Sequence, residues 1–226
     1  TLTPFSITVD QVIRAQGMNP QRVRQKSPKL IDLTAKAIEK GVTHLQPQAI
    51  YEELGVVASQ KDSLWLSNGK SLSGELIGQV LADAEKVFII VCTIGTEITE
   101  ITSQIFADDP ALGMAMEGLA SAAVEVAGNR VCEHIGRLAA ADGLHTGVPI
   151  NPGMIGWPVE EGQPQIFACL DTTPIGVSLT AQSLMLPLKS LSMVIGAGKN
   201  LQCGGNSCDY CNLQKTCNHK QTDGQP

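Results

Sequence analysis

Hydrophobic residues recur at helical spacing in five segments of the chain, which we interpret as helices. The clearest starts at Ser27-Pro28 and ends at Gly41, as expected for a helix that begins on a cap and a proline and stops at a glycine. The longest starts at Asp109-Pro110 and is rich in alanine and glycine, and its interior glycines indicate close packing or a ligand. The predicted helices cover residues 9–16, 28–41, 74–84, 96–105 and 110–141.

Other segments carry β-type patterns. Residues 87–92, Val-Phe-Ile-Ile-Val-Cys, form a continuous apolar run that predicts a strand buried on both faces. Residues 64–70 alternate and then turn at Asn68-Gly69, which predicts a hairpin or a strand end. Residues 175–180 alternate like a strand, residues 166–170 fit a short helix or a strand, and residues 185–193 lead to a predicted hinge at Gly196-Ala197-Gly198.

Between residues 143 and 164 the pattern changes to glycine, proline and asparagine with few periodic apolar positions. Such a composition predicts a structured loop. Long irregular loops inside compact domains are often functional, so this segment is a candidate site.

Composition and charge narrow the class of protein. Apolar residues make up 43% of the chain and charged residues 17%, as in ordinary soluble globular proteins. A net charge of −6 argues against partners such as nucleic acid or an anionic membrane surface. Residues 1–5 lack the basic and apolar character of a signal peptide, and the longest apolar run, residues 87–92, is too short to span a membrane. We therefore expect a soluble, cytoplasmic protein.

The seven cysteines fall into two groups. Cys92, Cys132 and Cys169 stand singly inside apolar patterns, where free cysteine behaves as a small buried hydrophobe. The other four lie close together in a C-x4-C-x2-C-x5-C spacing, which in a cytosolic chain points to metal rather than to disulfides. These four predicted metal ligands are Cys203, Cys208, Cys211 and Cys217.

The metal favoured by this spacing is an iron–sulfur cluster, most simply a 4Fe-4S cluster, because four thiolates with a C-x2-C pair are its usual ligand set. A structural zinc ion is the alternative, although zinc sites usually present two short-spaced pairs. Disulfides or uncoordinated thiols complete the possibilities. Hydrophobic content falls after residue 198, so we predict a body over residues 1–198 and a Cys-rich metal-binding tail over residues 199–226.

Three blocks of the body resemble the activation (reactivation) domain of cobalamin-dependent methionine synthase and its stand-alone relatives. One is residues 117–125 on the long helix, where the family keeps an acidic residue among alanines, here Glu125. Another is Asn151-Pro152-Gly153-Met154, which is similar to the family's Pro-Gly-Tyr loop. The most specific is residues 175–192, which resembles its Gly-x-x-Leu-Thr…Met-x-Pro…Ser-x-Ser pattern.

The resemblance implies an α+β fold with a twisted, largely antiparallel sheet packed with helices. It also implies a role in restoring a cob(II) corrinoid, where electron transfer is combined with methyl transfer from S-adenosylmethionine. Glu125, Pro152, Gly153 and Met154 are then the cofactor-binding positions. The family's loop reads Arg-x-x-x-Gly-Tyr, and here Pro149 and Met154 replace the arginine and the tyrosine that help hold S-adenosylmethionine. These replacements argue against S-adenosylmethionine binding in the family's manner.

The body and the tail together lead to three hypotheses. The first is an iron–sulfur accessory protein that docks on a corrinoid protein or methyltransferase and passes an electron to its cobalamin. The second is an S-adenosylmethionine-binding reactivation domain with a structural zinc tail. The third is a binding or assembly module for a corrinoid protein without redox activity. No Ser/His/Asp or Cys/His nucleophile constellation is evident in the sequence, so no catalytic residue is assigned.

Overall fold

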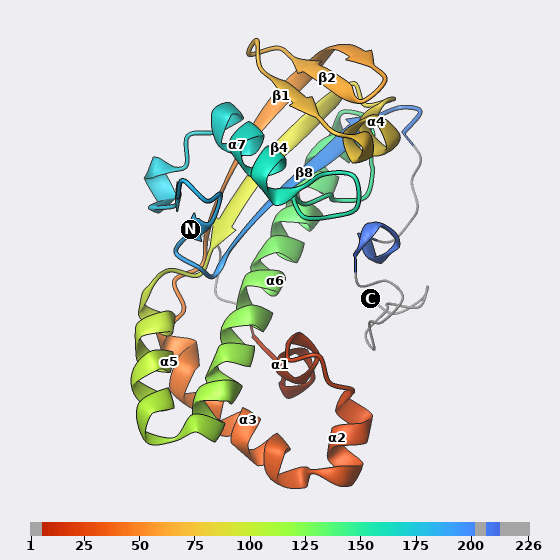
Figure 1. Cartoon of the computed structure of the whole chain (residues 1–226). Helices are drawn as coiled ribbons and strands as arrows, with labels where there is room; N and C mark the ends of the chain where they lie inside the picture. Colours follow the sequence, from red (N-terminus) through yellow and green to blue (C-terminus); the bar gives the residue numbers. More distant parts are fainter. Residues whose placement is uncertain (1–5, 202–206, 213–226) are drawn as a thin grey trace.

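The computed structural model describes residues 6–201 and 207–212, which adopt an α+β fold around a twisted antiparallel sheet (Figure 1). Its six strands are arranged in the order β3-β2-β1-β4-β8-β5, and all adjacent pairs are antiparallel. The strands are β1 (Gln48–Gln60), β2 (Ser63–Leu66), β3 (Ser71–Ser73), β4 (Lys86–Thr93), β5 (His145–Thr146) and β8 (Ser190–Gly198). A separate two-stranded sheet joins β6 (Ser178–Leu179) to β7 (Met185–Leu186).

The apolar run of residues 87–92, which the sequence predicted as a buried strand, lies in β4 at the centre of the sheet. Strand β4 pairs with β1 on one side and β8 on the other, so that Ile90 lies between Tyr51 and Met193. Residues 87–92 are fully buried, because helices or loops cover both faces of the strand. The predicted turn at Asn68-Gly69 joins β2 to β3, which confirms that hairpin.

Strand β1 is the longest strand, and its sequence pattern did not reveal it. Glu52 and Glu53 are adjacent and both exposed, and the register shifts between Val56 and Ala58, so the alternation of apolar and polar residues is interrupted. Pairing with β4 along its first eight residues decides its conformation.

Each predicted helix is present, together with helices that the pattern missed. Thr8 forms a capping box with Gln11, and Asp109 caps the long helix by accepting a hydrogen bond from Leu112 N–H. Helix α2 was not predicted, although Asn19-Pro20 is a cap followed by a proline. The helices are α1 (Val9–Ala15), α2 (Pro20–Lys26), α3 (Pro28–Gly41), α4 (Glu75–Leu81), α5 (Glu97–Asp108), α6 (Pro110–Ala141) and α7 (Val159–Cys169), with short 3-10 turns at Val42–His44, Thr173–Ile175 and Ser207–Tyr210.

Helix α6 runs through both halves of the molecule (Figure 1). Its C-terminal half packs Val131 and Ile135 against Phe88, Ile90 and other residues of one sheet face. Its N-terminal half forms a helical cluster with α1, α3 and α5 beyond the end of the sheet. Among the described residues, α6 alone is long and apolar enough to cross a membrane, and 61% of its most apolar window is buried inside the protein, as in a core helix.

Three local predictions differ from the structure. Gly196-Ala197-Gly198 is no hinge but the end of β8, where a Cβ on Gly198 would lie 2.7 Å from Asp83 O and one on Gly196 2.8 Å from Leu81 Cδ2. The glycines therefore serve close packing against the end of α4 and the turn after it. The predicted loop also ends earlier than expected, because α7 starts at Val159 and continues through Pro164 to Cys169. Of the strand predicted over residues 175–180, only Ser178–Leu179 pairs.

Candidate ligand loop and the tail that lies on it

The candidate loop, residues 147–158, connects β5 to α7 and is attached to the rest of the protein at both ends. Ile150 and Val194 of β8 exchange two backbone hydrogen bonds, of 3.0 and 2.9 Å. At the other end, Gly156 O accepts a hydrogen bond of 3.2 Å from Leu76 N–H at the start of α4. The loop is therefore a fixed element of the structure, as its composition predicted.

Two glycines give the loop its shape. Gly153 and Gly156 have positive φ angles of 100° and 83°, which L side chains rarely adopt. Between them the chain folds back, so that Gly153 N–H donates to Trp157 O at 2.8 Å and Trp157 N–H donates to Met154 O at 3.0 Å. Gly153 was a predicted site residue, and the structure places it at the turn itself.

Trp157 anchors the loop in the core beneath the sheet. Its side chain is fully buried, and Gly74 and Gly162 make room for it, since a Cβ on either glycine would lie 2.8 Å from the indole ring. Within the described part of the chain, Trp157 Nε1 is one of three buried side-chain nitrogen or oxygen atoms without a hydrogen-bond partner. A buried unpaired donor costs free energy, so this loop carries an unsatisfied polar group next to the candidate site.

A buried polar network fixes the start of the turn. Asn151 Nδ2 donates to Ser192 O at 2.7 Å, and Ser192 Oγ donates to Gln163 Oε1 at 3.0 Å. Ser192 and Gln163 are both buried, so the network ties the loop to β8 and α7. Sequence reasoning did not assign these residues to the site, although Asn151 opens the Asn-Pro-Gly turn and Ser192 ends the Ser-x-Ser block.

Met154 occupies the position at which the resemblance places a tyrosine. Its side chain is half-buried and packs against the core cluster, and its Sδ accepts a 3.4 Å contact from Asn151 N–H. Beside it lies an open surface hollow of about 420 Å³ that is lined by loop and α7 residues between Gly153 and Glu160 and by Asn212 of the tail. Pro149, at the place of the arginine, is half-buried in the same loop.

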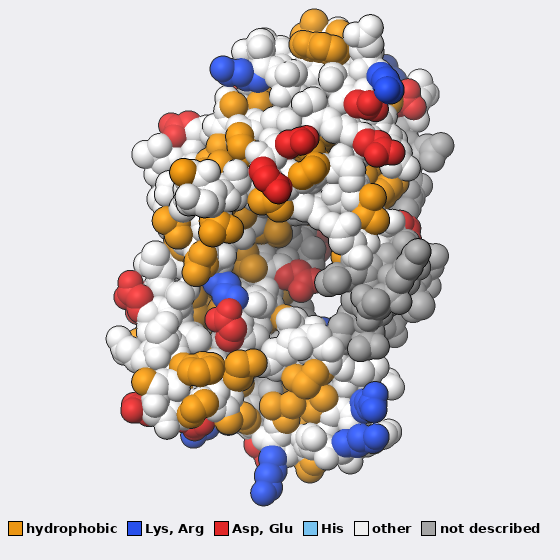
Figure 2. All heavy atoms as spheres, viewed as in Figure 1, with side chains coloured by type: hydrophobic (Ala, Val, Ile, Leu, Met, Phe, Trp, Pro, Cys, Tyr) orange, Lys and Arg blue, Asp and Glu red, His pale blue; other side chains and the backbone are white. Residues whose placement is uncertain are grey.

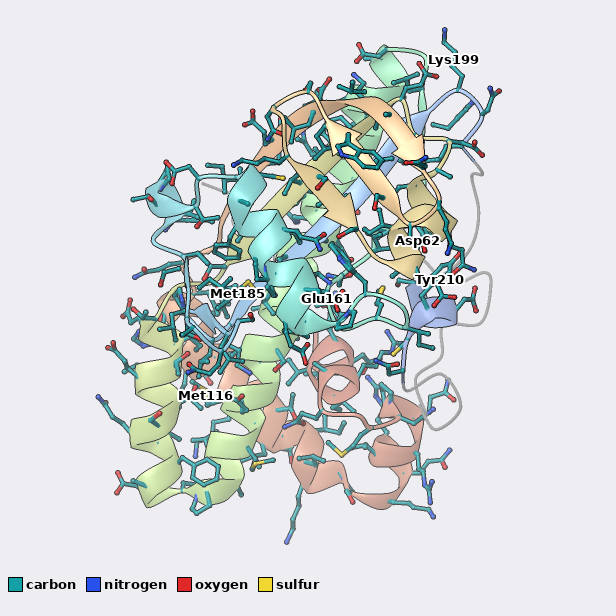
Figure 3. The ribbon with its side chains drawn as sticks, turned by 45° about the horizontal axis from the view of Figure 1, so that its top comes forward. Asp62, Met116, Glu161, Met185, Lys199 and Tyr210 are labelled. Carbon is teal, nitrogen blue, oxygen red and sulfur yellow. The ribbon has the colours of Figure 1, made fainter. Side chains whose placement is uncertain are left out.

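The tail segment 207–212 lies on this loop. Tyr210 O accepts a 2.9 Å hydrogen bond from Ile155 N–H, and Asn212 Nδ2 donates a 2.7 Å hydrogen bond to Gly153 O. The Tyr210 side chain packs against the same core cluster that holds Trp157. In Figure 3, Tyr210 lies on the tail turn and Glu161 on the neighbouring α7.

The predicted metal ligands are only partly described. Cys208 and Cys211 lie in the docked segment, each half-buried, and Cys211 N–H donates to Cys208 O at 3.3 Å. Cys203 and Cys217 lie outside the described residues. Among the residues that the structure describes, no group of three or more His, Cys, Asp or Glu side chains could hold a metal ion. The four-cysteine cluster and the boundary at residue 198 therefore stay predictions.

Glu125 is an exposed residue on α6. In the described part of the chain it makes no hydrogen bond or ion pair with the loop, so the structure does not join it to Pro152, Gly153 and Met154. On the same helix, Glu117 and Ser121 both bind Lys189 Nζ, which fixes the segment leading into β8.

A hollow separates the sheet from the helical cluster on one face of the molecule (Figure 2). Hydrophobic side chains border it in this view. Elsewhere on the surface, the β6–β7 hairpin and the residues after it carry three exposed leucines, Leu184, Leu186 and Leu188, with 45–63% of their surface accessible.

The comparison with solved structures decides the fold. The chain is similar to a crystal structure of the MetH reactivation domain bound to AdoHcy, with a TM-score of 0.70 and 12% sequence identity. The similarity covers 89% of this chain and 79% of that one. The chain has the reactivation-domain fold. The α+β class and the twisted antiparallel sheet that the resemblance implied are thereby confirmed, whereas no protein-family model and no curated protein sequence matches the chain.

Proposed function

We propose that this chain is a reactivation domain that docks on a corrinoid-binding partner and supports the return of its cob(II) form to the active state. The observation that carries this proposal is the fold likeness to the MetH reactivation domain over 89% of the chain. A fold can host more than one function, so the proposal also rests on the sequence resemblance, whose blocks include Glu125, the Asn151–Met154 loop and, most specifically, residues 175–192.

The ligand that we propose for the loop is S-adenosylmethionine or its product AdoHcy. The solved neighbour is bound to AdoHcy, and Pro152 and Gly153 match the family's loop. The arginine and tyrosine contacts are replaced by Pro149 and Met154, so binding here would depend on loop backbone groups. A contribution from the Glu125 carboxylate rests on the sequence resemblance alone. We expect weaker binding than an arginine–carboxylate contact provides, because that contact is charge-assisted and bidentate.

Calorimetric titration of the full chain with S-adenosylmethionine and with AdoHcy tests this ligand. We expect a measurable affinity that Glu125→Gln weakens, whereas Glu133→Gln, which changes another exposed glutamate of α6, leaves it unchanged. A second titration with a cob(II)-loaded corrinoid protein tests docking. No heat from either nucleoside and no complex with the corrinoid protein would together reject the proposed function.

The second candidate function is electron delivery by an iron–sulfur cluster in the tail. Two observations favour it: the C-x4-C-x2-C-x5-C spacing, and the contact between the loop and the tail segment 207–212, which carries Cys208 and Cys211. Reduction potentials of such clusters span a range that includes strongly reducing values, so a cluster that reduces a corrinoid is physically available.

Elemental analysis of protein purified without oxygen separates the two accounts of the tail. Iron at about four atoms per chain supports a cubane cluster and electron transfer. Zinc at about one atom per chain supports a structural site and leaves the reactivation role to the body. Absence of both metals removes the tail from the mechanism.

A further inference from the structure

The docked tail segment takes two backbone groups of the loop that the turn itself does not use. The turn is folded by hydrogen bonds from Gly153 N–H and to Met154 O. Gly153 O instead accepts a 2.7 Å hydrogen bond from Asn212 Nδ2, and Ile155 N–H donates a 2.9 Å hydrogen bond to Tyr210 O. The tail therefore holds one acceptor and one donor of the loop, on the two sides of Met154.

These contacts lie at the surface hollow. Asn212 lines the hollow together with the loop, while the Tyr210 side chain packs against the core cluster that contains Trp157. Asn212 itself is exposed, so its side chain contributes to docking and not to the core. We call residues 207–212 the strap, because they join this hollow to the core across the loop.

The proposed nucleoside ligands offer the same kinds of group as the strap. Adenine carries an amino donor at N6 beside a ring-nitrogen acceptor, whereas the strap offers a side-chain amide donor and a backbone carbonyl. A backbone N–H has one hydrogen to donate, so Ile155 N–H cannot serve Tyr210 O and a ligand at full strength together. A ligand that binds through the loop backbone must therefore displace the strap.

We propose that the strap is an autoinhibitory element that competes with an adenosyl ligand for the backbone of the loop. The inference rests on the proposed function, since it concerns the ligand proposed for the same site. Its consequence is quantitative. The apparent affinity is reduced to the fraction of molecules whose strap has left the loop, so any change that weakens docking of the strap strengthens ligand binding by the same factor.

Calorimetric titration of the full chain with S-adenosylmethionine and with AdoHcy measures this competition. Asn212→Ala removes one hydrogen bond of the strap, and the net contribution of one hydrogen bond shifts an equilibrium by about 2-fold to 10-fold. We expect this variant to bind the ligand more tightly by that factor. Asn200→Ala, at an exposed asparagine that precedes the strap, is the matched control and should bind as the wild type does.

Hydrogen exchange without ligand reports docking of the strap by itself. The Ile155 amide donates to Tyr210 O, so its exchange requires that this bond opens. We expect the amide to exchange about 2-fold to 10-fold faster in Asn212→Ala than in the wild type or in Asn200→Ala. Exchange at the same rate in all three proteins would overturn the inference, because Asn212 would then not hold the strap on the loop.

The two measurements together keep the two proposals apart. Faster exchange and tighter ligand binding in Asn212→Ala support the strap as a competitor. Faster exchange with unchanged affinity overturns the competition and leaves the proposed ligand standing. Faster exchange with no heat from either nucleoside in any of the three proteins rejects the proposed ligand, and the competition is rejected with it.

Discussion

The side-chain amide of Asn212 donates a 2.7 Å hydrogen bond to the carbonyl of Gly153, joining the cysteine-bearing tail to the candidate ligand loop. These residues lie 59 positions apart in the sequence. Asn212 and Gly153 both line the surface hollow next to Met154. The two features that the sequence marked separately, the loop and the cysteine tail, are thus neighbours in space.

Gly153→Ala tests the turn. The φ angle of 100° forces an L residue into a strained conformation, and the new Cβ would lie 3.1 Å from Val159 Cγ2. We expect a loss of about 1–2 kcal/mol of unfolding free energy and faster exchange of the Ile155 amide. Gly143→Ala, with a φ of 72° and nothing within 4 Å, should lose comparable stability without affecting Ile155. Equal exchange rates of the Ile155 amide in both variants would show that the contact with the tail does not depend on the shape of the turn.

Gly162→Ala tests the fit between α7 and the loop. Its Cβ would lie 2.8 Å from Trp157 Cε2 and 2.9 Å from Pro152 Cβ, so the variant should lose about 1–3 kcal/mol in a urea titration. Gly136→Ala in α6 is the control, since its nearest neighbour, Thr146 Oγ1, is 3.9 Å away. That variant should gain up to about 1 kcal/mol from helix propensity. A stabilised Gly162→Ala would show that the loop is not packed as described.

Lys86 should stabilise the fold in a pH-dependent way. Hydrogen bonds to Asp142 at 2.6 Å and Glu53 at 2.7 Å raise the pKa of Lys86 above its usual 10.5. The stabilisation is therefore complete below about pH 10.5 and is lost as the pH rises through the folded-state pKa. Lys86→Met should cost about 1 kcal/mol at pH 7, and its difference from the wild type should shrink above pH 10.5.

Lys61→Met is the control for this measurement, because the Lys61 side chain is 87% exposed. Denaturant titrations of the wild type and both variants between pH 7 and 11 provide the data. A difference between Lys86→Met and the wild type that stays constant up to pH 11 would contradict the assigned ion pairs.

The cysteines should differ in reactivity. Burial raises the pKa of the Cys92 thiol to about 12 and that of Cys132 to about 11, so almost no thiolate is available at pH 8. We expect iodoacetamide to modify the metal-free native protein at Cys208 and Cys211 and to spare Cys92, as peptide mass mapping would show. Zn²⁺ should protect the tail thiols, while Cys92 becomes reactive only in denaturant. Modification of Cys92 in the native protein would contradict its buried position.

Local signals revealed much of the fold. The apolar run at residues 87–92 predicted the central strand, and Pro28 with Gly41 bounded a helix, because each pattern depends on neighbours in the sequence. Strand β1 was missed because its residues do not alternate and its conformation depends on pairing with β4. The sequence suggested a hinge at Gly196 and Gly198. Both positions hold glycine because they contact α4 and the turn after it, and the sequence does not reveal that contact.

The candidate site divides in the same way. The sequence by itself determined the four-cysteine spacing and the Pro152-Gly153 turn. It also determined that the loop lacks the arginine and the tyrosine of the family it resembles. All three are matters of residue type and order. Only the tertiary structure decided that Tyr210 and Asn212 lie on that turn, that Trp157 is fully buried and that Glu125 makes no hydrogen bond or ion pair with the loop. Contacts between residues distant in sequence depend on how the sheet and the helices pack, and no local pattern of side chains records that packing.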